Sequence, residues 1–324
     1  MSATRRRSAG GTARVNAQAK INLVLRVFTP DATGYHPIET LFQRLDLADV
    51  VTVKATSGAK SLDVDGPMLP VDGLGPTERN LAWRAAELYA RETGFPGGWA
   101  ITIDKRIPVG GGLGGGSADA GAVLRALNEL APNPLSQVAL QSMGAALGAD
   151  VPFLAGDAVL AIGRGYGERL DPLMPLPRAL VLLAAFAEGV NTKAAYGWLD
   201  AARLPGEVIP KLGLAPEDVR DWGDVAELAL NDFEAVVAEH HLGVAAALRY
   251  FDAAVPSASG GFTMLSGSGA TVFALLPAMP NGEPFDDDVQ LLGLEVDPES
   301  IPDEIDVLAQ TVTAERVEPV ERLD

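Results

Sequence analysis

A glycine-rich stretch with the chemistry of an anion-binding loop occupies residues 108–121, PVGGGLGGGSADAG. Glycine costs about 0.5–1 kcal/mol relative to alanine in ordered structure, so such density indicates a backbone that approaches something closely. The stretch lies between a predicted strand and a predicted helix, and helix N-termini bind phosphate through unpaired N–H groups and a partial positive charge. The pattern predicts a phosphate-binding loop; the plainer alternative is a glycine-rich turn.

Two known phosphate-binding motifs fit this loop poorly. It contains no G-x-x-x-x-G-K-[ST] sequence. Gly110, Gly112 and Gly115 satisfy G-x-G-x-x-G, but so dense a glycine run satisfies it easily. A dinucleotide site also requires the motif after the first strand and an acidic residue about 20 positions later. Several elements precede this loop, and residues 131–139 contain no acid, which disfavours a dinucleotide oxidoreductase.

Three further residues could take part in charge or proton chemistry. Lys20 lies in AKINLVLRV, where the ordinary alternative is an exposed lysine on a strand. Asp150 lies in GADVPFLAG, and an Asp shortly before a proline also serves as a helix N-cap. Ser117 could bind a phosphate or Mg²⁺, or it could simply cap the helix that follows the loop. The three histidines, His36, His240 and His241, have no metal-ligand spacing.

The first element that positions these residues is a strand over residues 15–27. Its apolar residues alternate with polar ones, which predicts one buried face and one polar face. Lys20 and Asn22 share the polar face, about 7 Å apart along the strand.

The remaining elements mix strands and helices without regular alternation, so the fold class is α+β. We expect two domains, residues 1–170 and 171–324, with no internal repeats. The predicted elements are a loop at 29–36, strands at 47–55, 99–107 and 178–186, and helices at 80–91, 120–130 and 135–147.

The composition and charge of the sequence exclude several classes of protein. The 324 residues include no cysteine, no apolar run long enough to cross a membrane, and no apolar core of a secretory signal near the N-terminus. The net charge is −18, of which residues 281–324 carry −12 through fourteen acidic residues and two arginines. No basic stripe is present, so we expect no nucleic-acid partner. The lack of cysteine, of a secretory signal and of a membrane-spanning run leads us to expect a cytoplasmic protein without membrane partners. The acidic tail is expected to serve solubility, with an irregular segment at 279–306 and a final strand near 311–320.

Four motifs, in order, resemble those of the GHMP superfamily of small-molecule kinases. They are AKINLVLRV with the downstream GYH, PVGGGLGGGSADAG, GADVPFLAG and LSGSGATVFAL, and they span residues 17 to about 275. The Tyr35-His36 pair resembles the branch whose acceptor carries a cytidine diphosphate group. The resemblance implies a two-domain GHMP kinase fold with the active site in the interdomain cleft. It gives no expectation for the oligomeric state.

The resemblance also implies roles for individual residues. Asp150 would be the general base for the acceptor hydroxyl, assisted by Lys20, and the Gly267–Gly269 turn would lie near the transferred phosphate; a tight hairpin is its alternative. ATP, with Mg²⁺, would lie along Pro108, Val109, Gly110, Gly111, Gly112, Leu113, Gly114, Gly115, Gly116, Ser117 and Ala118. The acceptor would contact Asn22, Tyr35, His36, Thr192 and Tyr196.

The implied reaction is phosphorylation of the 2-hydroxyl of 4-diphosphocytidyl-2-C-methyl-D-erythritol, in the non-mevalonate route to isoprenoids. Tyr35 and Tyr196 would sandwich the cytosine, and His36 would contact its edge. Two alternatives remain open at this point: another GHMP kinase, of the homoserine or mevalonate type, or a nucleotide-binding protein without catalytic activity.

Overall fold

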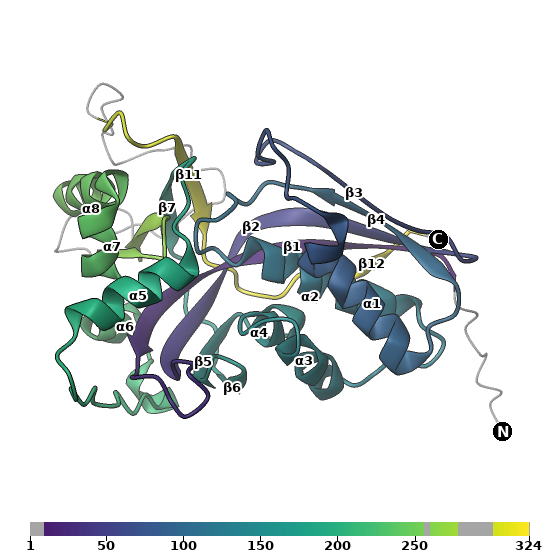
Figure 1. The fold of residues 1–324 in the computed structure, drawn as a ribbon, viewed down its shortest axis with the longest axis horizontal. Coiled ribbons are helices and arrows are strands. Elements are labelled where there is room, and N and C mark those ends of the chain that lie inside the picture. The colour runs from purple at the N-terminus through teal and green to yellow at the C-terminus, as the bar shows by residue number, and fades with distance from the viewer. Residues whose placement is uncertain (1–9, 256–259, 278–300, 324) are drawn as a thin grey trace.

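A computed structural model describes residues 10–255, 260–277 and 301–323, whose strands form two sheets (Figure 1). The larger sheet has the main order β12-β1-β2-β4-β3, and β5, β6 and β8 attach beside it. Its strands are β1 (Thr12–Val27), β2 (Ile38–Thr56), β3 (Lys60–Asp65), β4 (Gly98–Asp104), β5 (Leu160–Gly165), β6 (Arg169–Pro172), β8 (Leu230–Asn231) and β12 (Glu321–Arg322). The smaller sheet has the order β11-β7-β10-β9, formed by β7 (Leu180–Ala185), β9 (Phe262–Leu265), β10 (Val272–Leu276) and β11 (Val307–Val312).

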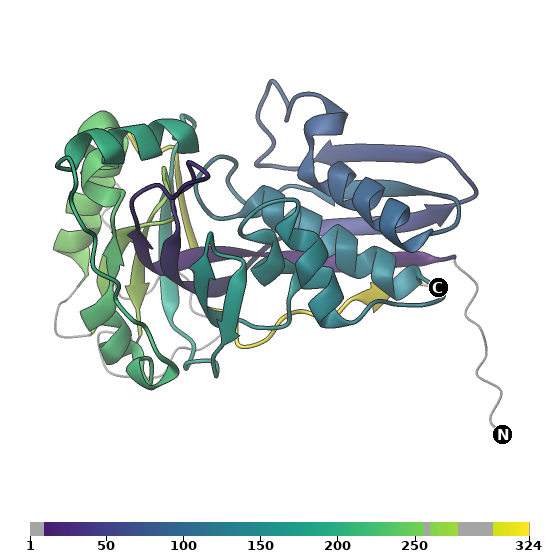
Figure 2. The same cartoon turned by 60° about the horizontal axis from the view of Figure 1, so that its bottom comes forward.

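The helices divide between the two sheets. One group gathers on one face of the larger sheet, with α2 packed on β1, β2, α1 and α4: α1 (Leu81–Thr93), α2 (Gly115–Leu130), α3 (Gln137–Ala145) and α4 (Val151–Ala155) (Figures 1 and 2). The other group lies with the smaller sheet at one end of the molecule: α5 (Thr192–Ala202), α6 (Trp222–Leu228), α7 (Glu234–His240) and α8 (Leu242–Ala254). The α+β class is therefore confirmed. Every predicted helix and strand up to β7 is present, although β2 begins nine residues before the predicted strand at 47–55.

The prediction of one buried face on the first strand is wrong for the half that carries Lys20. Asn16 is exposed between buried neighbours, as expected, but every residue from Ala17 to Leu25 is buried. The pairing of β1 with β2 is irregular between Gln18 and Lys20, and there the backbone N–H of Lys20 donates to Leu113 O at 3.0 Å. The glycine loop thus covers the face that the alternation predicted to be polar and open.

The C-terminal residues do not follow a simple two-domain division. The predicted boundary at residue 170 falls inside β6 of the larger sheet, and both β8 and β12 return to that sheet from the C-terminal half. The boundary stays a prediction. Most of the predicted irregular segment at 279–306 lies outside the described residues. The prediction of a final strand near 311–320 is wrong for most of its length, because β11 begins at Val307 and ends at Val312, and residues 314–320 form no strand.

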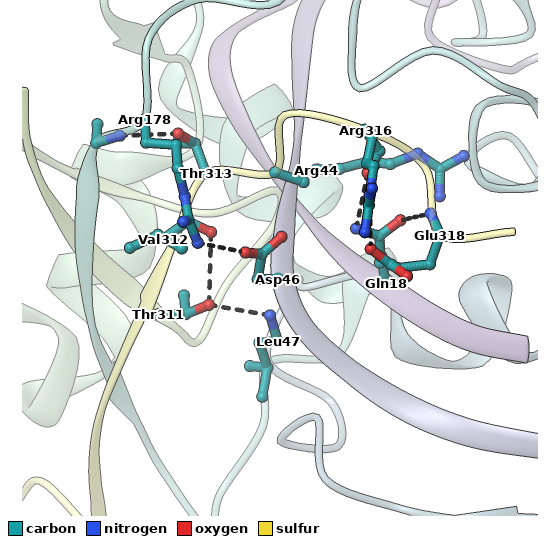
Figure 3. Close-up of polar contacts among 12 residues, drawn as sticks. Gln18, Arg44, Asp46, Leu47, Arg178, Thr311, Val312, Thr313, Arg316 and Glu318 are labelled. Carbon is teal, nitrogen blue, oxygen red and sulfur yellow. Dashed lines mark hydrogen bonds and ion pairs between the residues drawn. The ribbon is translucent and has the colours of Figure 1, made fainter. Parts of the chain in front are cut away.

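Residues 307–323, here called the C-terminal strap, cross from the smaller sheet to the larger one (Figure 3). Thr313 pairs with Leu45 of β2, and the Gln18 side chain on β1 exchanges two hydrogen bonds with the strap backbone. Its amide donates to Arg316 O at 3.2 Å and accepts from Glu318 N at 3.1 Å. This part of the acidic tail therefore joins the two sheets, a structural role that the charge pattern alone did not predict.

Candidate active site

The glycine loop connects β4 to α2 and adopts a conformation that only glycine tolerates well. Gly110, Gly112 and Gly114 have φ of +79°, +76° and +73°, in the left-handed region. Gly114 is the N-cap, so α2 begins at Gly115 and Ser117 lies inside its first turn. The alternative role of Ser117 as the cap is therefore wrong.

Two of the loop glycines are required because the loop packs closely against another segment of the protein, residues 266–271. A Cβ at Gly111 would lie 2.2 Å from Thr271 Oγ1, and one at Gly112 would lie 2.1 Å from Ser266 O. Thr271 N donates to Gly111 O at 3.0 Å, and Ser266 Oγ donates to Gly112 O at 3.1 Å. The loop is thereby held against the turn that contains Gly267–Gly269.

Lys20 is buried beneath this loop and its ammonium group is closely held. Nζ donates to Asn22 Oδ1 at 2.6 Å and to Gly112 O at 2.9 Å. It lies 3.5 Å from Asp150 Oδ2, although the two residues are 130 positions apart in the sequence. A Cβ at Gly267 would lie 3.4 Å from the same nitrogen, so the 266–271 turn also borders this site.

Asp150 immediately precedes α4, as its sequence pattern predicts, but its carboxylate makes no capping hydrogen bond. The side chain is 29% exposed, and it lies beside the 4% exposed Lys20 side chain. A carboxylate that is not engaged by the helix and lies beside a fixed cation can accept a proton from a bound hydroxyl.

Residues 108–117 line a cavity of about 460 Å³ together with Asn80, Leu81, Lys105 and Thr192. Here the structure brings together the residues predicted to bind ATP, with two qualifications. Ala118 is buried behind the loop and is absent from the lining, and the Leu113 side chain is almost fully buried. We call this space the nucleotide cavity.

A buried ion cluster forms one side of the nucleotide cavity. Lys105 Nζ pairs with Asp49 and, at 2.8 Å, with Asp119 Oδ2. Asp49 also accepts from the backbone N–H of Arg106 and Ile107, whereas Asp119 Oδ1 has no hydrogen-bond partner among the described residues. Burial raises the pKa of Asp119 to about 7, with the neighbouring negative charge of Asp49 adding to the effect.

A second cavity, of about 300 Å³, adjoins the first, and we call it the acceptor cavity. Gly112, Gly114, Ser117 and Thr192 line both cavities. The acceptor cavity is also lined by Lys20, Asn22, Asp150 and Tyr196. Four of the residues predicted to act on or contact an acceptor therefore border one space, and Thr192 lies where the two spaces meet.

Tyr35 and His36 lie outside the lining of the acceptor cavity. The His36 ring is 4.6 Å from the Tyr196 ring, and His36 Nε2 lies 2.9 Å from Asp200 Oδ1. Tyr35 is 70% exposed and makes an edge contact with Tyr166 at 5.9 Å. Burial raises the pKa of Tyr196, and the negative charge of Asp150 adds to this effect, so its phenol stays neutral. The structure brings His36 to Tyr196 but does not pair Tyr35 with Tyr196.

Sequence reasoning missed two aromatic residues of the acceptor cavity, Tyr166 and Phe233. Tyr166 donates to Asp31 Oδ2 at 2.7 Å and so ties the 29–36 loop to the β5–β6 turn. An aromatic residue between glycines in GRGYG was the available signal, because it places a large side chain on a turn. Phe233 packs edge-on against Tyr196 at 4.9 Å, and no sequence pattern marked it.

The part of the chain that the structure describes contains neither a cluster of metal-ligating side chains nor a membrane-spanning helix. No group of three acidic, histidine or cysteine side chains comes together as a metal site. No helix there combines the length and apolar character that crossing a membrane requires.

Comparison with known proteins gives consistent matches. The family of GHMP kinases N terminal domains matches residues 80–157, which include the glycine loop and Asp150. The 4-diphosphocytidyl-2-C-methyl-D-erythritol kinase of Gloeobacter violaceus is 37% identical over 270 residues, covering 82% of this chain and 85% of that protein. A crystal structure of 4-(cytidine 5'-diphospho)-2C-methyl-D-erythritol kinase is 34% identical, with a TM-score of 0.62 and coverage of 81% of this chain and 89% of that one.

A more distant structure shows the fold alone. Homoserine kinase from Cytophaga hutchinsonii has a TM-score of 0.64 and covers 98% of both chains, but it is only 18% identical. The likeness in sequence therefore distinguishes the cytidyl branch from the wider fold. The chain is an ATP-dependent small-molecule kinase with the GHMP kinase fold, and it belongs to the 4-diphosphocytidyl-2-C-methyl-D-erythritol kinase family.

Proposed function

We propose that this protein transfers the γ-phosphoryl group of ATP to the 2-hydroxyl of 4-diphosphocytidyl-2-C-methyl-D-erythritol. The observation that carries the proposal is the junction of the two cavities, where the Asp150 carboxylate lies 3.5 Å from Lys20 Nζ. A phosphate donor on one side and a hydroxyl acceptor on the other would meet there. The names of the relatives supply the acceptor, and the adjoining aromatic residues fit its cytosine.

In the proposed reaction, Asp150 accepts the proton of the acceptor hydroxyl as its oxygen attacks the γ-phosphorus. The bond from that phosphorus to the β–γ bridging oxygen breaks, and ADP leaves. Lys20 stabilises the charge that develops on the attacking oxygen, and the N–H groups at the start of α2 face the phosphates. Phosphoryl transfer depends mainly on positioning and charge stabilisation, which these fixed groups provide.

Mg²⁺ would neutralise charge on the phosphates when bound with ATP. Ser117 is the fitting protein group, since its residue lies in the first turn of α2 and lines both cavities. The described residues offer no carboxylate cluster beside it, so the remaining oxygen ligands would come from phosphates and water, as is common for Mg²⁺.

Cytosine recognition is the second part of the proposal. Tyr166 and Tyr196 line the acceptor cavity, His36 packs against Tyr196, and Tyr35 stands exposed beside Tyr166. Tyr35 would close over the base and His36 would contact its edge. Asp200 holds one nitrogen of His36, which leaves the other for the base.

Kinetics of two variants test the proposed chemistry. Asp150→Asn keeps the shape but removes the base, and Lys20→Ala removes the cation; each should lower kcat by about 10²–10⁴-fold. The matched control is Asp157→Asn, an exposed carboxylate seven residues further on that lines neither cavity. An Asp150→Asn variant with kcat within about threefold of the parent would show that another group takes the proton.

A further inference from the structure

A chain of three buried hydrogen bonds ends at the Lys20 ammonium. Thr40 on β2 is fully buried, and its Oγ1 donates to Val24 O at 2.6 Å. Asn22 Nδ2 donates to Thr40 Oγ1 at 2.8 Å, and Lys20 Nζ donates to Asn22 Oδ1 at 2.6 Å. Neither Thr40 nor Val24 lines the acceptor cavity, so the chain reaches the site from behind.

The direction of each bond in this chain is determined by chemistry. A backbone carbonyl only accepts, so the Thr40 hydroxyl must donate its one proton to Val24 O. The Thr40 oxygen can then only accept, and it requires the NH₂ end of Asn22. The oxygen of Asn22 is thereby turned toward Lys20. With the amide reversed, NH₂ and ammonium donors would face each other at 2.6 Å.

We propose that Thr40 is a positioning residue for phosphoryl transfer, which through Asn22 fixes the Lys20 ammonium at its distance from Asp150. The inference rests on the proposed roles of Lys20 and Asp150. It also gives Asn22, which lines the acceptor cavity, a second role, because its amide links Thr40 to Lys20 and its side chain is buried.

The chain of hydrogen bonds determines which groups hold the Lys20 ammonium and how closely it approaches Asp150. Asn22 Oδ1 and Gly112 O hold two of the three ammonium protons, and Asp150 lies further away at 3.5 Å. Without the oxygen of Thr40, the amide of Asn22 is free to turn. The ammonium then moves toward Asp150 and forms a closer ion pair, which occupies the oxygen that should accept the proton.

The test compares Thr40→Val, Thr40→Ala and Thr40→Ser. Valine keeps the shape of threonine and alanine leaves more room, but both lack the side-chain oxygen, whereas serine retains it. We expect kcat to fall about tenfold or more in Val and Ala, with KM for ATP and for the acceptor within about twofold. Ser should return kcat to within about threefold of the parent.

The control is Thr313→Val, in the C-terminal strap. Thr313 is also buried and its hydroxyl oxygen accepts from Ala179 N at 2.9 Å, but it lies outside both cavities. This variant should lose stability to urea and keep the parental kcat.

Two outcomes would overturn the inference: folded Thr40→Val and Thr40→Ala with parental kcat, or a Ser variant as slow as Val. The first outcome would mean that turnover does not depend on the side-chain oxygen of Thr40. The second would mean that turnover depends only on how the side chain packs. The comparison is made with the acceptor that the parent phosphorylates. A parent that ignores the cytidyl acceptor therefore counts against the proposed substrate and not against Thr40.

Discussion

Gly114→Ala is a perturbation whose effect on Lys20 can be worked out from the structure. The residue has φ of +73°, where an L-residue costs about 1–2 kcal/mol. The added Cβ would lie 3.0 Å from Lys20 Cγ and 3.1 Å from Lys20 Cε. Carbon atoms in contact prefer about 3.5–4.0 Å, so the lysine stem must shift by about 0.5–1 Å. A misplacement of about 1 Å at a reacting centre can cost about 10²-fold in rate. We therefore expect kcat to fall about 10- to 100-fold, mainly through Lys20.

Gly94→Ala is the matched control. Gly94 ends α1 with φ of +66°, and no atom lies within 4 Å of an added Cβ. Both variants should lose free energy of unfolding, measured with urea, because both place alanine in the left-handed region, and the close contacts of the added Cβ should make the loss larger for Gly114→Ala. Only Gly114→Ala should lose turnover, measured by ADP release under saturating ATP and acceptor. Parental turnover in Gly114→Ala, or an equal loss in Gly94→Ala, would refute the reasoning.

Three further sets of predictions concern the ion cluster, the residues proposed to bind the cytosine, and the strap. Burial raises the pKa of Asp119 from 3.8 to about 7, so its protonated form stabilises the folded state; this stabilisation is complete below about pH 4 and is lost as the pH rises through 7. Asp119→Asn should flatten the pH dependence of the free energy of unfolding over that range, and parallel curves for parent and variant would contradict the assignment. Tyr35→Ala should raise KM for the cytidyl acceptor about 10- to 100-fold and leave KM for ATP unchanged, since stacking on an aromatic ring contributes about 1–3 kcal/mol. His36→Ala should weaken discrimination against a uridyl analogue; equal effects on both substrates would argue against cytosine recognition at these residues. Gln18→Leu should lower the free energy of unfolding by about 1–3 kcal/mol, because Arg316 O and Glu318 N lose their partner; an unchanged urea midpoint would show that the strap does not depend on it.

Local sequence patterns predicted the elements well where the pattern and the burial agree. The helices predicted at 80–91 and 135–147 are present as α1 and α3 within two residues at each end, and the helix predicted at 120–130 ends as α2 does, at Leu130. The alternation in residues 15–27 predicted β1 but misjudged its second half. Burial of the Lys20 face depends on the glycine loop, about 90 residues later, and on the 266–271 turn. Contacts between such distant segments leave no trace in local periodicity.

In the candidate site, too, local features could be predicted from the sequence and contacts between distant segments could not. The position of the glycine loop before α2 could be predicted from glycine density and its place between a strand and a helix, because both are local. The requirement for glycine at Gly111 and Gly112 could not be predicted from local sequence, because the atoms that leave no room for a Cβ there belong to the distant Thr271 and Ser266. The approach of Lys20 to Asp150 was expected only from family resemblance, and the chain through Thr40 required the pairing of β1 with β2.

The most direct test of the proposed function measures which hydroxyl receives phosphate. The purified parent is incubated with ATP, Mg²⁺ and one acceptor at a time: 4-diphosphocytidyl-2-C-methyl-D-erythritol, homoserine or mevalonate. ADP release is followed together with ³¹P NMR of the product. The proposal predicts one ADP per acceptor with the cytidyl compound alone, and a new phosphomonoester on its 2-oxygen. Faster transfer to homoserine or mevalonate, or a phosphate on a different oxygen of the cytidyl compound, would contradict it.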